Sequence, residues 1–179
     1  MFMKWIARAL AALNSNAKKE QIAAGIACGV LLALVPSGNL LWIFLFGLFF
    51  FFKIHYGLQI IALAACKLAA PLFASGLDAL GWAVLHSDPL QPFFVALADA
   101  PIAPLTRFNN TVVMGGLVAG IALWLPLFFA FRALVALYRA RLAPRIAGSK
   151  AYGAFMKIPL VARLSKATSA VTKLRGALE

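Results

Sequence analysis

Two long apolar stretches, joined by a short polar turn, open the patterned part of the chain. Ile22 to Val35 and Leu40 to Phe52 are apolar almost throughout, and Pro36-Ser37-Gly38-Asn39 between them is typical of a turn. Each stretch would be roughly 20 Å long as a helix, whereas a bilayer core of ~30 Å requires about 20 apolar residues. The pattern therefore predicts either one long helix broken at Pro36 or a re-entrant hairpin over residues 22–52.

Two further apolar stretches are long enough to cross a membrane. Tyr56 to Phe73 is interrupted by Gln59 and Lys67 and is stopped by Pro71. Val112 to Phe131 holds twenty consecutive uncharged residues. The pattern predicts spanning helices over residues 56–73 and 112–131.

The segment between these two spans has a different composition. Residues 75–110 contain three of the five acidic residues of the chain, four prolines and one basic residue, Arg107. We predict short apolar helices near Leu77–Leu85 and Phe93–Ala98, which form a cap on the outer side of the membrane.

Both ends of the chain have the pattern of helices that lie in a membrane interface. In residues 1–13, Lys4 and Arg8 interrupt the apolar residues, so this segment is not expected to be a cleavable signal. In residues 139–179, basic residues alternate with leucines at near-helical spacing. The sequence thus predicts an all-α integral membrane protein, with a membrane domain over residues 1–138 and a basic amphipathic tail over residues 139–179.

Composition and charge support the membrane and exclude most soluble classes. The chain is 64% hydrophobic and only 12% charged, and its formal charge is +12. A basic chain can bind nucleic acid, but this apolar content indicates a membrane instead. Basic flanks mark the cytoplasm, so both termini are expected there, with the cap in the periplasm. Only a hairpin over residues 22–52 satisfies this topology with two further crossings.

The candidate contact residues fall into three groups. Gly25 with Gly29, and Gly116 with Gly120, have the spacing that lets helices approach closely, within one subunit or against a partner. The turn at Pro36, Ser37, Gly38 and Asn39 is either structural or, as in some transporters, part of a substrate site. Three isolated basic residues either bind phospholipid headgroups or extend to the nearest interface, namely Lys53, Lys67 and Arg107.

Catalytic, metal and cofactor sites are not indicated. Cys28 and Cys66 lie in apolar stretches without ligand spacing, and no nucleotide loop or catalytic triad pattern occurs. His86 near Asp88 is the one arrangement that a membrane enzyme acting on lipid could use. We therefore expect no enzyme activity and no cofactor.

Two segments resemble a known bacterial membrane family. Gln21 to Gly29, followed by Leu34-Val35-Pro36-Ser37-Gly38, resembles the family called domain of unknown function 2062, over roughly residues 18 to 85. Thr106 to Gly115 is similar to a smaller subgroup of that family. The chain departs from the family pattern at Lys53-Ile54-His55, where a basic residue followed closely by Asn is expected. The resemblance implies a bacterial inner-membrane protein, and the subgroup implies a larger envelope protein as partner.

Three functions remain open from the sequence. The first is an inner-membrane subunit that docks a larger membrane-anchored envelope protein, in phospholipid transport towards the outer membrane. The second is a small transporter or channel that acts as a homo-oligomer. The third is a lipid-modifying membrane enzyme. Membrane phospholipids are expected partners in each case, and nucleic acid is not.

Overall fold

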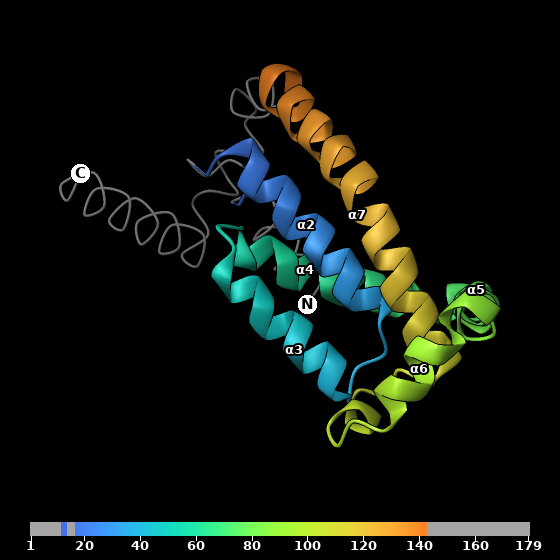
Figure 1. Cartoon of the computed structure of the whole chain (residues 1–179). Coiled ribbons are helices and arrows are strands. Elements are labelled where there is room, and N and C mark those ends of the chain that lie inside the picture. The colour runs from blue at the N-terminus through green and yellow to red at the C-terminus, as the bar shows by residue number, and fades with distance from the viewer. Residues whose placement is uncertain (1–11, 14–16, 143–179) are drawn as a thin grey trace.

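The computed structural model describes residues 12, 13 and 17–142, and this part of the chain is helical without strands (Figure 1). All but the last two residues of the predicted interfacial helix over residues 1–13, and most of the predicted tail over residues 139–179, lie outside the described residues. The all-α class that the sequence predicts is therefore confirmed for the central part of the chain.

The first two apolar stretches form an antiparallel helical hairpin. Helix α2 (Lys19–Leu34) is followed by α3 (Leu40–Leu48), which η1 (Phe49–Phe51) extends by a 3₁₀ turn (Figure 1). The backbone N–H of His55 donates to the carbonyl of Gln21 at 3.0 Å, so the chain leaves the hairpin beside the point where it entered. This geometry excludes the alternative of one long helix broken at Pro36.

The next helix runs alongside α2 in the same direction. Helix α4 (Tyr56–Ala69) begins beside Gly25 of α2 and ends near the C-terminal end of α2, where Lys67 contacts Val35. It continues through the 3₁₀ segment η2 (Ala70–Phe73), which contains Pro71, into α5 (Ala74–Leu85). Figure 1 shows α5 nearly end-on while α2 and α7 lie across the view, so the helical run changes direction between α4 and α5.

The cap consists of short helices. After α5 come η3 (Asp88–Leu90), α6 (Gln91–Ala98) and η4 (Ala103–Thr106). Helices α5 and α6 begin three and two residues before the predicted starts at Leu77 and Phe93. A small apolar cluster, which includes Ala103, Phe108 and Met114, packs the cap against the last long helix.

The last long helix, α7 (Thr111–Leu137), runs antiparallel to α2 and continues into a π-helical turn, η5 (Tyr138–Leu142). The indole N–H of Trp124 donates to Sγ of Cys28 at 3.3 Å, and Arg132 lies 3.3 Å from the Glu20 carboxylate. The main apolar core extends from Cys28 towards the turn end of α2 and consists of Cys28, Leu31, Leu32, Val35, Leu45, Phe49 and Val113.

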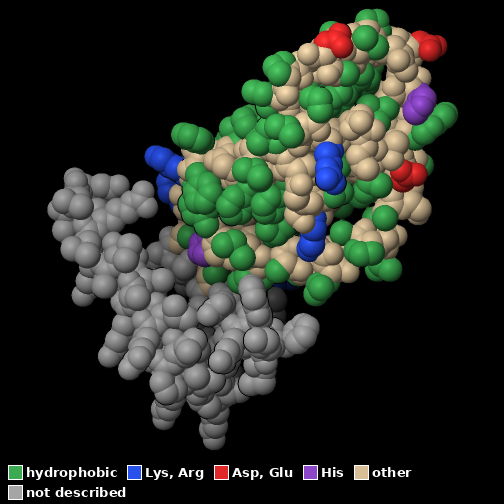
Figure 2. Space-filling model, turned by 90° about the horizontal axis from the view of Figure 1, so that it is seen from below, with side chains coloured by type: hydrophobic (Ala, Val, Ile, Leu, Met, Phe, Trp, Pro, Cys, Tyr) green, Lys and Arg blue, Asp and Glu red, His purple; other side chains and the backbone are tan. Residues whose placement is uncertain are grey.

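Apolar side chains also cover much of the outside. Leu68 and Leu72 are 79% and 80% exposed, and Phe51 is 88% exposed. Figure 2 shows hydrophobic side chains over much of one face, with acidic side chains towards the end away from the undescribed residues. The helical runs Tyr56–Leu85 and Thr111–Arg141 are each long and apolar enough to cross a membrane. Apolar exposure on this scale is unusual for a soluble monomer and needs lipid or a partner to cover it.

Replacement of Gly115 by Ala tests the packing of α5 on α7. A Cβ at Gly115 would collide with the Leu77 carbonyl, whereas a Cβ at Gly76 of α5 meets nothing within 4 Å. We expect Gly115→Ala to lower the free energy of unfolding by about 1–3 kcal/mol. The matched control Gly76→Ala is expected to leave it unchanged or to raise it by up to about 1 kcal/mol, because Ala favours helix. Thermal unfolding in a mild detergent measures both, and equal effects would contradict this packing.

Candidate functional site

The hairpin turn is closed by its own side chains. Gly38 has φ +91°, a conformation that glycine adopts at no steric cost. The Asn39 side chain caps α3 by accepting from the Trp42 N–H at 2.8 Å, and its amide donates to the Pro36 carbonyl at 2.8 Å. Asn39 is only 5% exposed, so this residue holds the turn from the inside.

Lys67 satisfies the C-terminal end of α2. Its Nζ donates to the carbonyl of Val35 at 2.8 Å and lies 3.4 Å from the carbonyl of Ala33. The last carbonyls of a helix have no partner within that helix, and a cation is favoured beside them. Lys67, which interrupts the apolar stretch 56–73, thus contacts the chain at Val35, just before the hairpin turn and 32 residues away in sequence.

The four predicted glycines lie in contacts between helices of this chain. A Cβ at Gly25 would meet the His55 carbonyl at 2.7 Å, and one at Gly29 would lie 2.8 Å from Ala62 of α4. On α7, Gly116 approaches the Leu34 carbonyl and Gly120 approaches Leu31. The first pair therefore allows α4 to pack closely on α2, and the second pair allows α7 to pack closely on α2. These faces are occupied within the chain, so a partner needs another surface.

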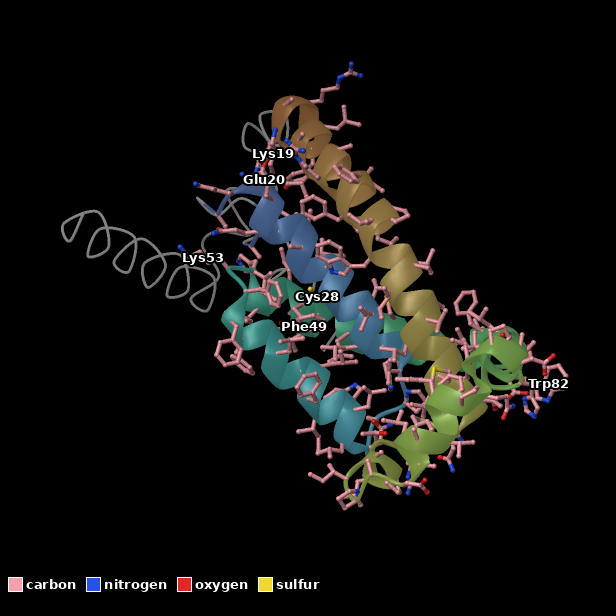
Figure 3. The ribbon with its side chains drawn as sticks, viewed as in Figure 1. Lys19, Glu20, Cys28, Phe49, Lys53 and Trp82 are labelled. Atoms are coloured by element: carbon pink, nitrogen blue, oxygen red, sulfur yellow. The ribbon has the colours of Figure 1, made fainter. Side chains whose placement is uncertain are left out.

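Most of the described basic residues gather at one end of the bundle, whereas Lys67 and Arg107 lie elsewhere. Figure 3 shows Lys19, Glu20 and Lys53 on the side of the molecule away from Trp82. Arg139 lies at the same end, because its guanidinium donates to the carbonyls of Leu13 and Ala17 at 3.1 and 2.9 Å.

Two titratable groups at this end have shifted pKa values. A backbone N–H hydrogen bond, with the Arg132 guanidinium adding to it, holds the pKa of the Glu20 carboxyl below its ordinary value. Burial lowers the pKa of His55, which favours a neutral imidazole. A neutral ring is consistent with His55 Nδ1 accepting the Leu58 N–H at 3.3 Å.

Arg107 lies at the opposite end, in the cap. With Pro104, Asn109 and Asn110 it lines a shallow, open hollow of about 410 Å³. Arg107 has φ +53°, and it is the one non-glycine residue with positive φ among those described. The sequence identified Arg107 as a candidate, but gave no sign of the hollow or of the unusual backbone.

The structure divides the predicted residues among three places. The turn, Lys67, and Gly116 with Gly120 lie together where α2, α4 and α7 meet, whereas Lys53 lies at the basic end and Arg107 in the cap. Sequence reasoning missed Gly81, whose backbone touches Thr111 and Gly115, and the hydrogen bond from Thr111 to Asp78. It also missed that Gln59 is 2% exposed, with its amide nitrogen lacking a partner in the described part of the chain.

His86 does not form an acid–base pair with Asp88 in the described structure. The ring stacks on Trp82 with centroids 4.5 Å apart, and Nδ1 lies 3.0 Å from the Trp82 carbonyl. No group of three or more His, Cys, Asp or Glu residues that could hold a metal occurs among the residues described.

The structure thus defines an all-helical bundle in which two helical runs have the length and composition of membrane spans. The chain is 36% identical to an uncharacterized protein of Treponema pallidum (strain Nichols) over 151 residues, which are 84% of this chain and 93% of that protein. The chain belongs to the same family as the Treponema protein. No protein family model matches the sequence, and no solved structure matches it.

Lys67→Met tests the cap that Lys67 provides. The substitution keeps the length of the side chain but leaves the Val35 and Ala33 carbonyls without their donor, which we expect to cost about 1–3 kcal/mol of unfolding free energy. The control Lys53→Met removes an exposed cation and is expected to have little effect. Thermal unfolding in detergent compares the two, and a Lys67→Met protein as stable as Lys53→Met would contradict a capping role.

Proposed function

We propose that this chain is a non-enzymatic subunit of a bacterial inner membrane, which docks a membrane helix of a larger envelope protein. The observation that carries the proposal is the exposure of Tyr56–Leu85. Of its most apolar 18 residues, only 6% are buried within the chain. Most side chains of this run stay uncovered within the chain, so a second helix can pack against them.

A partner helix fits best along α4 and α5. Leu68 of α4, Leu72 of η2 and Gly76 of α5 are all exposed along this helical run. Gly76 has open space beside it, which permits close approach of another backbone. The small-residue faces of α2 and α7 are already occupied, which favours this surface over the pairs that the sequence identified.

The distribution of charge supports one orientation in the membrane. The described cations Lys18, Lys19, Lys53, Arg132, Arg139 and Arg141 lie at one end with one acid, Glu20, whereas Asp78, Asp88 and Asp99 are in or beside the cap helices at the other. Basic flanks stay in the cytoplasm, so both termini are cytoplasmic and the cap is periplasmic. The resemblance to the domain of unknown function 2062 family supports the same location.

We propose that the complex takes part in the transport of phospholipid towards the outer membrane. A larger envelope protein needs an anchor in the inner membrane, where phospholipid is taken up. The basic cytoplasmic end is suited to anionic headgroups, because each Lys or Arg near such a surface contributes about 1 kcal/mol.

Gly76→Trp tests the docking surface. A large side chain at this open position would hold a partner helix away without disturbing the packing within the chain. The protein, purified gently from its own membranes and analysed by mass spectrometry, is expected to retain a larger envelope protein at fixed stoichiometry. Gly76→Trp is expected to lose it by about tenfold or more. The matched control, Gly47→Trp on α3, also has nothing within 4 Å and should retain the partner.

Two results would overturn the docking proposal. The first is that the chain purifies without a partner in every mild detergent. The second is that Gly76→Trp and Gly47→Trp lose the partner to the same extent. A homo-oligomer without a partner would instead favour the transporter or channel.

Cysteine labelling in intact cells tests the orientation. In a chain with Cys28 and Cys66 replaced by Ala, Ser87→Cys between α5 and η3 is expected to react with a membrane-impermeant maleimide from outside. Lys18→Cys at the start of α2 is expected to react only after the membrane is opened, because it lies at the basic end. The reverse pattern would contradict the proposed topology.

A further inference from the structure

The hollow in the cap is lined mainly by hydrogen-bond donors. Its described lining consists of Pro104, Arg107, Asn109 and Asn110, all of them exposed. Arg107 and Asn109 make no side-chain hydrogen bond or ion pair in the described part of the chain. The Asn110 oxygen is used, because it accepts the Val113 N–H at 3.1 Å, which leaves its NH₂ group to donate. The lining therefore offers a guanidinium and two amides without a carboxylate among them.

The backbone that carries Arg107 is fixed on both sides. The Arg107 N–H donates to the Pro104 carbonyl at 3.1 Å, and the Arg107 carbonyl accepts the Asn110 N–H at 2.9 Å. Next to it, the Thr106 hydroxyl donates to the Ala103 carbonyl at 2.6 Å. These bonds fix the backbone of the short segment that carries Arg107 and the two asparagines, so the three donor side chains project from one hydrogen-bonded loop.

The backbone conformation of Arg107 has an energetic cost that another residue would avoid. A left-handed φ is unfavourable for a residue with a Cβ, whereas glycine adopts it without that cost. Strain of this kind persists mostly where a side chain has a role that glycine cannot fill. The guanidinium is the part of Arg107 that glycine would remove.

We propose that this hollow binds the phosphate group of a phospholipid headgroup. A guanidinium pairs with phosphate through two parallel N–H bonds, and the asparagine amides can donate to its remaining oxygens. Placement of the hollow at the outer headgroup level rests on the proposed function, because it requires α7 to cross the membrane from Val112 inwards. Phosphate recognition itself does not depend on a protein partner.

The experiment measures binding to the full chain in a mild detergent that lacks phosphate. The probes are a short-chain phosphatidylglycerol and inorganic phosphate, each titrated by calorimetry. Arg107→Gln is expected to weaken lipid binding by about tenfold or more, because it removes the charge that pairs with phosphate. The control, Leu105→Gln, introduces the same side chain at an exposed position of the cap that does not line the hollow, and it is expected to change the affinity less than twofold.

Arg107→Gly separates binding from folding. Because glycine relieves the left-handed backbone, this variant is expected to unfold at the same temperature as the natural chain or above it, yet to lose lipid binding as Arg107→Gln does. Lipid binding that depends on Arg107 supports a headgroup site. Inorganic phosphate that binds as tightly as lipid, and depends equally on Arg107, overturns the lipid as source while keeping phosphate chemistry.

Two outcomes overturn the site altogether. The first is that neither probe binds, and the second is that Arg107→Gln and Leu105→Gln weaken binding equally. A failure to find an envelope partner would not affect these titrations, so the two proposals can fail separately.

Discussion

The close approach of α2 to two neighbouring helices is the contact on which the rest of the bundle depends. Gly25 and Gly29 of α2 let α4 and its N-terminal flank approach closely. Gly116 and Gly120 of α7 let α2 approach α7 closely. In a lipid environment, helix association depends on such van der Waals contact, because lipid tails and apolar side chains are equally apolar. Helix α2 therefore becomes the central helix, although its 16 residues are fewer than a membrane span requires.

The central position of α2 requires that its C-terminal end be satisfied without water. Lys67 reaches the Val35 and Ala33 carbonyls, the Trp42 indole donates to the Leu32 carbonyl at 3.0 Å, and Asn39 caps the start of α3. A broken helix in a membrane is tolerated where protein groups satisfy its backbone. The turn thus has partners from α3 and α4, and Asn39 has a structural role in it.

Much of this architecture could be predicted from the sequence, because apolar stretches and turn residues act locally. The hairpin over residues 22–52, the long helix near residues 112–131 and the short helices of the cap all follow from such patterns. The partners of individual residues could not be predicted in the same way. Lys67 meets Val35, and Thr111 meets Asp78, only because helices distant in sequence pack together.

The backbone of Arg107 was beyond sequence analysis for a different reason. Arginine has no preference for positive φ, so no pattern indicates it. The glycine pairs gave a partial signal, because their spacing predicted close contact between helices. In the structure the first pair contacts α4 and its N-terminal flank, and the second pair brings α7 against α2.

The hydrogen bond between His55 and Gln21 has a consequence for how the chain is made. Each arm of the hairpin is too short to cross a bilayer comfortably alone, so the two arms are expected to leave the translocation machinery together, as one closed unit. Helix α4 follows directly and packs on α2 through contacts about 30 residues apart in sequence. A three-helix unit can therefore form before α7 is synthesised, and α7 then adds to a surface that already exists.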